Sequence, residues 1–321
     1  MKFPLVCSAA SLVALFSQCQ PSPENNATAE PVFVVAKDTC ALGEGAFWYA
    51  EAQEFWWVDI EGKALHVLET GSGTRHQYPV GSRLGTVVPD TEGHAILALE
   101  GEGIVRYDRA QNQSTPIAHP LDSLEDIRYN DGKCDPSGRL WVGSMHLEQI
   151  TGAASLYRVD PDGSASKWRD SVTISNGLCW SADRQTMYYI DTPTGTVRAF
   201  SYQDAEGSID EGRVVVTIPD SLGFPDGMTI DAEDKLWIAL WNGNSVTRWD
   251  PETGKLMEQI AVPAHNVSSC AFGGANLDTL YITTARVDMT PEELARFPDA
   301  GSVFGTVPGV KGAPMHLFGQ E

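Results

Sequence analysis

Positive charge is scarce in this sequence of 321 residues, which has 22 Lys and Arg against 43 Asp and Glu and a formal net charge of -21. A surface of this sign repels phosphate backbones, so nucleic acid is not expected as a partner. It suits a soluble, exported protein. Long helical patterns are also lacking, because segment 290–297 is the one short amphipathic stretch. The sequence therefore favours an all-β fold.

Several catalytic motifs are absent as well. There is no G-x-S-x-G nucleophile elbow, no P-loop and no H-E-x-x-H sequence. The Gly-x-Gly of "GEGAFW" lacks the dinucleotide fingerprint and its βαβ setting. These absences remove the chemistry that each motif would supply.

Cysteine is sparse, with six in the chain and no C-x-x-C pair. The four that follow the N-terminal segment are too widely spaced for a compact disulfide framework; they are Cys40, Cys134, Cys179 and Cys270. We expect buried free thiols, with a disulfide as the alternative in an exported protein.

The N-terminal segment has the features of an export signal. Lys2 precedes an apolar run from Phe3 to Phe16, which is too short to span a bilayer. Cys19 follows, as in a bacterial lipoprotein signal, although Gln18 stands where a small residue is usual. We predict a lipoprotein-type signal over 1–19, a flexible tether over 20–30, and a periplasmic or outer-membrane location with Cys19 as a membrane tether. An ordinary cleaved signal peptide is the alternative.

A unit of turn residues, an apolar pair and a short strand recurs six times from residue 40 onward. The second residue of each pair serves as an anchor, and the six anchors are Trp56, Ile96, Trp141, Tyr188, Trp237 and Tyr281. They are 40, 45, 47, 49 and 44 residues apart. A period near 45 residues with about four strands per unit is typical of a β-propeller blade. The sequence therefore predicts one six-bladed β-propeller over 31–321, with the anchors as core between blades.

A ring of blades must close, because a single blade cannot bury both of its faces. The strand-like "PVFVVA" at 31–36 precedes the first complete unit and has no partner there. We predict that it completes the last blade beside "SVFGTV" at 302–307.

Polar residues recur at one position of this repeat. Eleven or twelve residues before four of the anchors stand Glu44, Asn130, Asn176 and Asp226. The equivalent residues of the second and sixth units are Gly85 and Ser268. This position begins the innermost strand of each blade, so the four side chains should converge on the central channel.

Converging oxygens of this kind suit a divalent cation. The two carboxylates would repel each other without one. Oxygen-only ligands favour Ca²⁺, with Mg²⁺, Mn²⁺ or Zn²⁺ as alternatives. Taken singly, each Asn-Gly or Asp-Gly pair is more often a turn than a ligand. A turn does not explain four polar residues at one offset.

Four segments, "LGEGAFW", "RYNDGKCDPSGRLWVGSM", "SNGLCW" and "PDGMTIDAEDKLWIALWNG", resemble the SMP-30/gluconolactonase/regucalcin-like family of sugar lactonases. The resemblance covers about residues 38–315. It implies a six-bladed propeller and one divalent metal bound by Glu44, Asn176 and Asp226. It also implies substrate contacts from Arg128 and Asn130.

Other residues have two readings each. The resemblance places a further substrate contact at Glu148, which is otherwise a solvated loop carboxylate, while His146 beside it is given no role. Arg83 is either a substrate contact or a surface residue. Asn266 and Ser268 either line the channel or serve in turns and packing.

The function that follows is hydrolysis of a gluconolactone-like sugar lactone to the aldonic acid. The metal would polarise the lactone carbonyl, and Asp226 would act as general base as well as ligand. We expect a monomer with a small-molecule sugar lactone as its partner. The alternatives are a phosphotriesterase or another lactonase, and a propeller that binds a sugar or a protein without catalysis.

Overall fold

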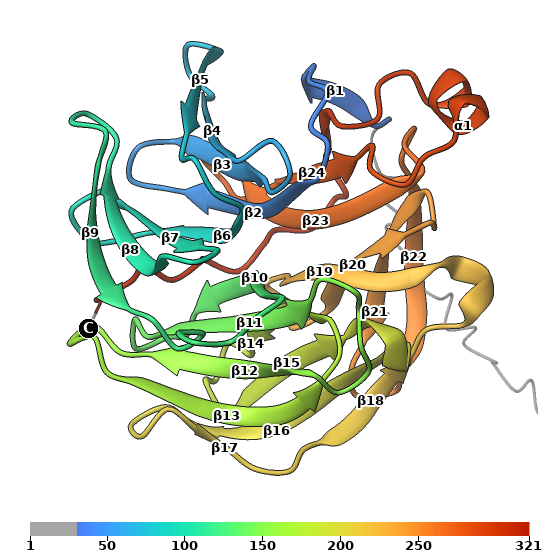
Figure 1. Cartoon of the computed structure of the whole chain (residues 1–321). Coiled ribbons are helices and arrows are strands. Elements are labelled where there is room, and N and C mark those ends of the chain that lie inside the picture. Colours follow the sequence, from blue (N-terminus) through green and yellow to red (C-terminus); the bar gives the residue numbers. More distant parts are fainter. Residues whose placement is uncertain (1–30, 321) are drawn as a thin grey trace, which may run out of the picture.

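Six antiparallel sheets surround a central axis in the computed structural model, which describes residues 31–320 (Figure 1). The prediction of an all-β, six-bladed propeller is therefore confirmed. The predicted signal peptide (1–19) and tether (20–30) lie outside the described residues. Within residues 31–320, no helix is both long enough and apolar enough to cross a membrane.

Each blade is a sheet of four or five strands, and its inner three strands follow chain order from the channel outward. Blade one contains β2 (Gly43–Tyr49), β3 (Glu54–Asp59), β4 (Ala64–Glu69) and β5 (Thr74–Pro79), and blade two contains β6 (Leu84–Pro89), β7 (Ala95–Leu99), β8 (Gly103–Asp108) and β9 (Gln113–Ala118). Blade three contains β10 (Ile127–Cys134), β11 (Leu140–His146), β12 (Ala154–Val159) and β13 (Ala165–Val172). Blade four contains β14 (Ser175–Trp180), β15 (Thr186–Asp191), β16 (Thr196–Gln203), β17 (Ser208–Ile209) and β18 (Arg213–Thr217). Blade five contains β19 (Phe224–Ile230), β20 (Leu236–Trp241), β21 (Ser245–Asp250) and β22 (Lys255–Ala261).

The sixth blade joins the two ends of the ring. It contains β23 (Asn266–Gly273), β24 (Thr279–Ala285), β25 (Val303–Thr306) and the N-terminal strand β1 (Phe33–Ala36), which pairs antiparallel with β25. This confirms that segment 31–36 completes the last blade. The inner strands β2, β6, β10, β14, β19 and β23 each contact the next, and β23 contacts β2. The ring is therefore closed.

The repeat anchors form the core between blades. Trp56, Trp141 and Trp237 have no exposed surface. A buried indole must place its N–H, and in two blades an aspartate of the preceding turn accepts it: Trp141 Nε1 donates to Asp135 Oδ2 over 2.9 Å, and Trp237 Nε1 donates to Asp231 Oδ2 over 2.9 Å. The turns before these anchors thus accept the hydrogen bonds of the buried indole groups, in addition to reversing the chain.

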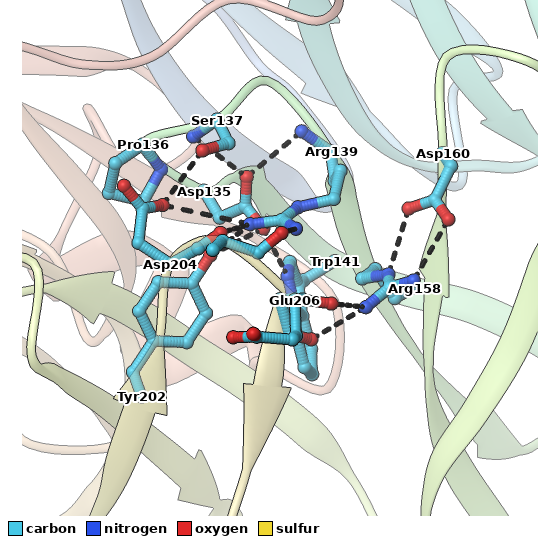
Figure 2. A network of polar contacts seen from close by, with 12 residues as sticks. Asp135, Pro136, Ser137, Arg139, Trp141, Arg158, Asp160, Tyr202, Asp204 and Glu206 are labelled. Carbon is cyan, nitrogen blue, oxygen red and sulfur yellow. Dashed lines mark hydrogen bonds and ion pairs between the residues drawn. The ribbon is translucent and has the colours of Figure 1, made fainter.

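The Asp135 carboxylate also ties blade three to blade four, as Figure 2 shows. Its Oδ2 accepts hydrogen bonds from Arg139 Nε over 2.7 Å and from the Tyr202 hydroxyl over 2.7 Å. Arg158 pairs with Asp160 and donates to the main-chain oxygen of Glu206 over 2.7 Å. This polar network lies away from the channel and is structural.

One end of the channel is covered by the C-terminal segment 311–320. Gly312 bridges to Asp231 of blade five, and Phe318 bridges to Asp90 of blade two. Further main-chain hydrogen bonds join this segment to Leu277 of blade six and Gly138 of blade three. A segment that contacts several blades in this way holds them together where the inner strands end, whereas the cavity described below lies where they start.

Two smaller predictions also hold. Segment 290–297 contains the single described α-helix, α1 (Pro291–Arg296), which begins with a capping box between Thr290 and Glu293. The four described cysteines are buried free thiols. The remaining helical turns within residues 31–320 are short 3₁₀ segments at Thr192–Thr194 and Asp220–Leu222.

Candidate functional site

Every inner strand is interrupted at a corresponding place near its start. The pairing with the second strand of the blade shifts register between Glu44 and Phe47, Leu84 and Val87, Tyr129 and Gly132, Asn176 and Leu178, Pro225 and Met228, and Val267 and Ser269. A bulge of this kind bends the strand and re-aims side chains. The repeat position found in the sequence lies within or beside it. The bulges therefore explain why one offset from the anchors selects the residues at the channel mouth.

The open mouth contains a cavity of about 790 Å³. It is lined by five of the six residues predicted for the site, namely Glu44, Arg128, Asn130, Asn176 and Asp226. They come from four different blades, and all five are buried. Closure of the ring is therefore what brings them together.

Glu148 lies apart from this group. Its side chain is exposed, and it does not line the cavity, whereas its neighbours Leu147 and Gln149 do. Its main-chain N–H donates to His146 Nδ1 over 3.0 Å. The substrate contact assigned to Glu148 by resemblance stays a prediction.

The structure also places the three residues for which the sequence left two roles open, Arg83, Asn266 and Ser268. Arg83 lines the cavity, but its guanidinium pairs with Glu61 at 2.9 Å and Glu100 at 3.3 Å, so its charge is already balanced. Asn266 and Ser268 are buried and do not line the cavity. Ser268 Oγ donates to the main-chain oxygen of Gly43 and so serves in packing between the sixth and first blades.

A chain of hydrogen bonds fixes the amides at the mouth. Arg128 Nη1 donates to Asn130 Oδ1 over 2.7 Å, and Asn130 Nδ2 donates to Asn176 Oδ1 over 2.9 Å. Asn176 Nδ2 donates to Thr192 Oγ1 over 2.7 Å, and Thr192 Oγ1 donates to the main-chain oxygen of Pro225 over 2.8 Å. The Asn176 amide thus has one orientation, and its oxygen keeps a second lone pair for another partner.

Three carboxylates are buried around this chain. Burial raises the pKa of Glu44, and the nearby Asp131 carboxylate raises it further, while the Arg128 guanidinium opposes the rise. Burial likewise raises the pKa of Asp226, with added contributions from Glu44 and Asp131. Asp226 Oδ1 is buried and has no hydrogen-bond partner among residues 31–320. The three carboxylates outnumber the two cations that act on them, Arg128 and Lys133.

A divalent cation would fit this donor set. Glu44, Asn176 and Asp226 supply oxygen ligands of which two carry charge, and one oxygen of Asp226 is unpartnered within the described chain. Oxygen donors suit Ca²⁺, Mg²⁺ or Mn²⁺. A cation there would offset the repulsion that raises both carboxyl pKa values.

The search along the repeat missed residues that the structure places here. Asp131 follows Asn130 directly, and both are buried at the bulge of β10. Its burial could have been predicted from the sequence, because a bulged strand can bury two neighbouring side chains. Thr192, Trp241, His265 and Glu293 line the cavity from loops and strand ends. Thr192 and Trp241 each stand four residues after an anchor, as the cavity-lining Met145 does after Trp141, so a second offset of the repeat marks them. His265 and Glu293 stand at no such offset.

Comparison with known proteins agrees with this fold. The family described as SMP-30/Gluconolactonase/LRE-like region matches residues 42–286. The chain is 40% identical over 272 residues to the putative sugar lactone lactonase YvrE of Bacillus subtilis, covering 84% of this chain and 93% of that protein. It is 36% identical over 287 residues to regucalcin of Danio rerio, covering 88% and 97%.

A solved structure is similar over nearly the whole length. The calcium-binding protein regucalcin of Agrobacterium tumefaciens superposes with a TM-score of 0.86 at 28% identity, covering 91% of this chain and 99% of that one. The fold is therefore a six-bladed propeller of the class to which regucalcin belongs. The chain belongs to the SMP-30/gluconolactonase/LRE-like family.

Proposed function

We propose that this chain hydrolyses a sugar lactone of the gluconolactone type to the open-chain aldonic acid. Glu44, Asn176 and Asp226 would hold one divalent cation, and Ca²⁺ is the ion that we favour. The observation that carries the proposal is the buried Asp226 carboxylate at the mouth, with Oδ1 unpartnered within residues 31–320. The family supports the reaction class, since one relative is described as a putative sugar lactone lactonase and another as calcium-binding.

The chemistry that a bound cation supplies is Lewis acidity toward the lactone carbonyl oxygen. Asp226 would take the proton from a water molecule as that water adds to the carbonyl carbon. The ester bond to the ring oxygen would then break, and the ring oxygen would receive the proton held by Asp226 and become a hydroxyl. The product is the aldonic acid, with atoms and charge balanced by the one water consumed.

Arg128 and Asn130 would bind and orient the sugar hydroxyls. Both line the cavity, and their mutual hydrogen bond of 2.7 Å fixes their relative position. Groups held in place before the substrate arrives lower the entropic cost of orienting it. Thr192 would act through Asn176, whose amide it holds.

A panel of aldonolactones tests the proposal, with an organophosphate triester assayed on the same preparation. Asp226→Asn should lower kcat/KM by about a hundredfold or more, because a general base contributes about that much. Asp162→Asn changes an exposed carboxylate outside the cavity and is the control. Wild-type lactonase rates in a folded Asp226→Asn variant would refute the catalytic assignment. Hydrolysis of the triester alone would favour the phosphotriesterase alternative.

A further inference from the structure

A second cluster of ligand-type side chains lies at the seam of the ring, outside the cavity. Asp38 and Cys40 belong to the segment that leads from β1 to β2, and His66 lies in β4. One ligand atom from each of the three lies within 4.8 Å of the others. None of the three lines the channel cavity.

The segment that carries Asp38 and Cys40 is fixed to the last blade. The main-chain N–H of Cys40 donates to the oxygen of Gly301 over 3.1 Å. The N–H of Asp38 donates to Ser302 Oγ over 3.1 Å, and that hydroxyl donates back to the oxygen of Asp38. The cluster therefore joins blade six, through this segment, to His66 of blade one.

One polar atom in this cluster, His66 Nε2, is buried without a hydrogen-bond partner within the described chain. Asp38 Oδ2 accepts no hydrogen bond there either, but it lies 3.3 Å from the Arg75 guanidinium and 3.4 Å from His66 Nδ1. The neighbouring Asp59 differs, because its two oxygens accept main-chain N–H groups of Ala41, Leu42 and Gly62 at 2.9 to 3.0 Å. An unsatisfied buried polar group is destabilising. His66 thus has a ring nitrogen for which the described chain supplies no partner, and Asp38 has a carboxylate oxygen that accepts no hydrogen bond.

One distance between two of these ligand atoms is the one that a tetrahedral metal requires. His66 Nδ1 lies 3.4 Å from Asp38 Oδ2. In a tetrahedral zinc site with ligand distances of about 2.0–2.1 Å, two ligand atoms lie about 3.3 Å apart. The imidazole is already held in place, since it stacks on Trp57 with ring centroids 4.9 Å apart.

The charges are also compatible with a dication. The Arg75 guanidinium lies 3.3 Å from Asp38 Oδ2, and Asp59 adds a further negative charge close by. Zn²⁺ with a thiolate, a carboxylate and a neutral imidazole has no net charge, so Arg75 would not be repelled. Burial, with Asp38 and Asp59 beside it, raises the pKa of Cys40 to about 12, so the thiol keeps its proton unless a metal displaces it.

We propose that Asp38, Cys40 and His66 form a zinc-type site that fastens the seam between the last and first blades. A water molecule on the partly exposed side of Asp38 would complete four ligands. The thiolate and imidazole select Zn²⁺ or Co²⁺ over Ca²⁺. The chain would then carry two metals of different chemical type, an oxygen-bound one in the channel and a sulfur-bound one at the seam.

Cobalt spectroscopy on the full chain separates the two sites. After removal of metal with a chelator, Co²⁺ should produce a sulfur-to-cobalt charge-transfer band and the strong visible bands of a tetrahedral site. Cys40→Ala should abolish both. Cys270→Ala, which removes another buried free thiol, should keep them. Asp226→Asn should keep them too, so the outcome does not depend on the channel or on lactonase activity.

Stability gives a second measurement. One equivalent of Zn²⁺ should raise the melting temperature of the wild type and of Asp226→Asn, and should leave Cys40→Ala unchanged. If Cys40→Ala does not fold, His66→Asn retains the thiol and should weaken Co²⁺ binding at least about tenfold. A wild type without the charge-transfer band, or a band unchanged in Cys40→Ala or in His66→Asn, would overturn the proposal.

Discussion

Asn130 of the third blade donates a hydrogen bond to the side-chain oxygen of Asn176 in the fourth blade, over 2.9 Å. Thr192 holds the other end of the same amide over 2.7 Å. The orientation of Asn176 is therefore set from two sides before any ligand binds. Partners of this kind orient metal ligands and tune their affinity.

Removal of the Thr192 hydroxyl should lower the affinity for the proposed channel cation without removing one of its ligands. Thr192→Val leaves the Asn176 amide held from one side, so we expect about a tenfold loss in Ca²⁺ affinity, measured by calorimetric titration. Thr194→Val, in the same 3₁₀ turn but exposed and outside the cavity, is the control. Equal affinities in the two variants would contradict the orienting role.

The glycine that follows Asn176 should not accept a side chain. A Cβ at Gly177 would lie 2.6 Å from Met228 Cβ and 2.7 Å from the main-chain oxygen of Asp226. Gly177→Ala should therefore destabilise the protein by about 1–3 kcal/mol and displace Asp226. Gly71→Ala, which meets no atom within 4 Å, is the matched control in urea unfolding. If both variants unfold alike, the close approach is not limiting.

The Asp135 network of Figure 2 should be a major source of stability. Asp135→Ala leaves the Arg139 guanidinium and the Trp141 and Tyr202 donors without their shared acceptor. We expect a loss of about 3–5 kcal/mol, as for other broken buried ion pairs, in chemical denaturation. Asp162→Ala removes an exposed carboxylate and should change stability little. A small effect at Asp135 would show that water replaces its partners readily.

Acid should loosen the C-terminal segment through His316. Burial, with Arg184 nearby, lowers the pKa of His316. Its Nδ1 lies 2.8 Å from the Gln320 amide nitrogen, which can only donate, so this ring nitrogen accepts. The folded state favours neutral imidazole. Its stabilising contribution is present above the ordinary histidine pKa and is lost as the pH falls through that range.

The measurement is the drop in unfolding free energy between about pH 7 and about pH 5. This drop should be smaller in His316→Gln than in the wild type. His119→Gln replaces an exposed histidine of a surface loop and should leave the drop unchanged. An identical drop in all three proteins would exclude His316 as the acid-sensitive group.

The sequence predicted the blades and the residues at the mouth because both depend on periodicity. The anchors repeat because each blade buries the same face, and Glu44, Asn130, Asn176 and Asp226 share an offset because each inner strand bulges near its start. Thr192 stands four residues after the anchor Tyr188, and Met145 and Trp241 stand at the same offset; all three line the cavity. This second offset could have been found in the sequence, whereas His265 and Glu293, which also line the cavity, stand at no such offset.

Two other features could not be predicted from the sequence, for related physical reasons. The C-terminal segment 311–320 crosses several blades in an irregular conformation, so no strand pattern predicts its role. The cluster at the seam unites Asp38 and Cys40 with His66 through folding of the ring. Their spacing in the chain follows no metal-binding motif.

The pairing of β1 with β25 has a thermodynamic consequence for the mouth of the channel. The proposed cation ligands come from the first, fourth and fifth blades, so they converge only in a closed ring. Cation binding and ring closure are then linked. A cation at Glu44, Asn176 and Asp226 stabilises the pairing of β1 with β25, and a change that separates these strands lowers the binding free energy of the cation by the same amount. Affinity for the channel cation would therefore report on a joint that this cation does not touch.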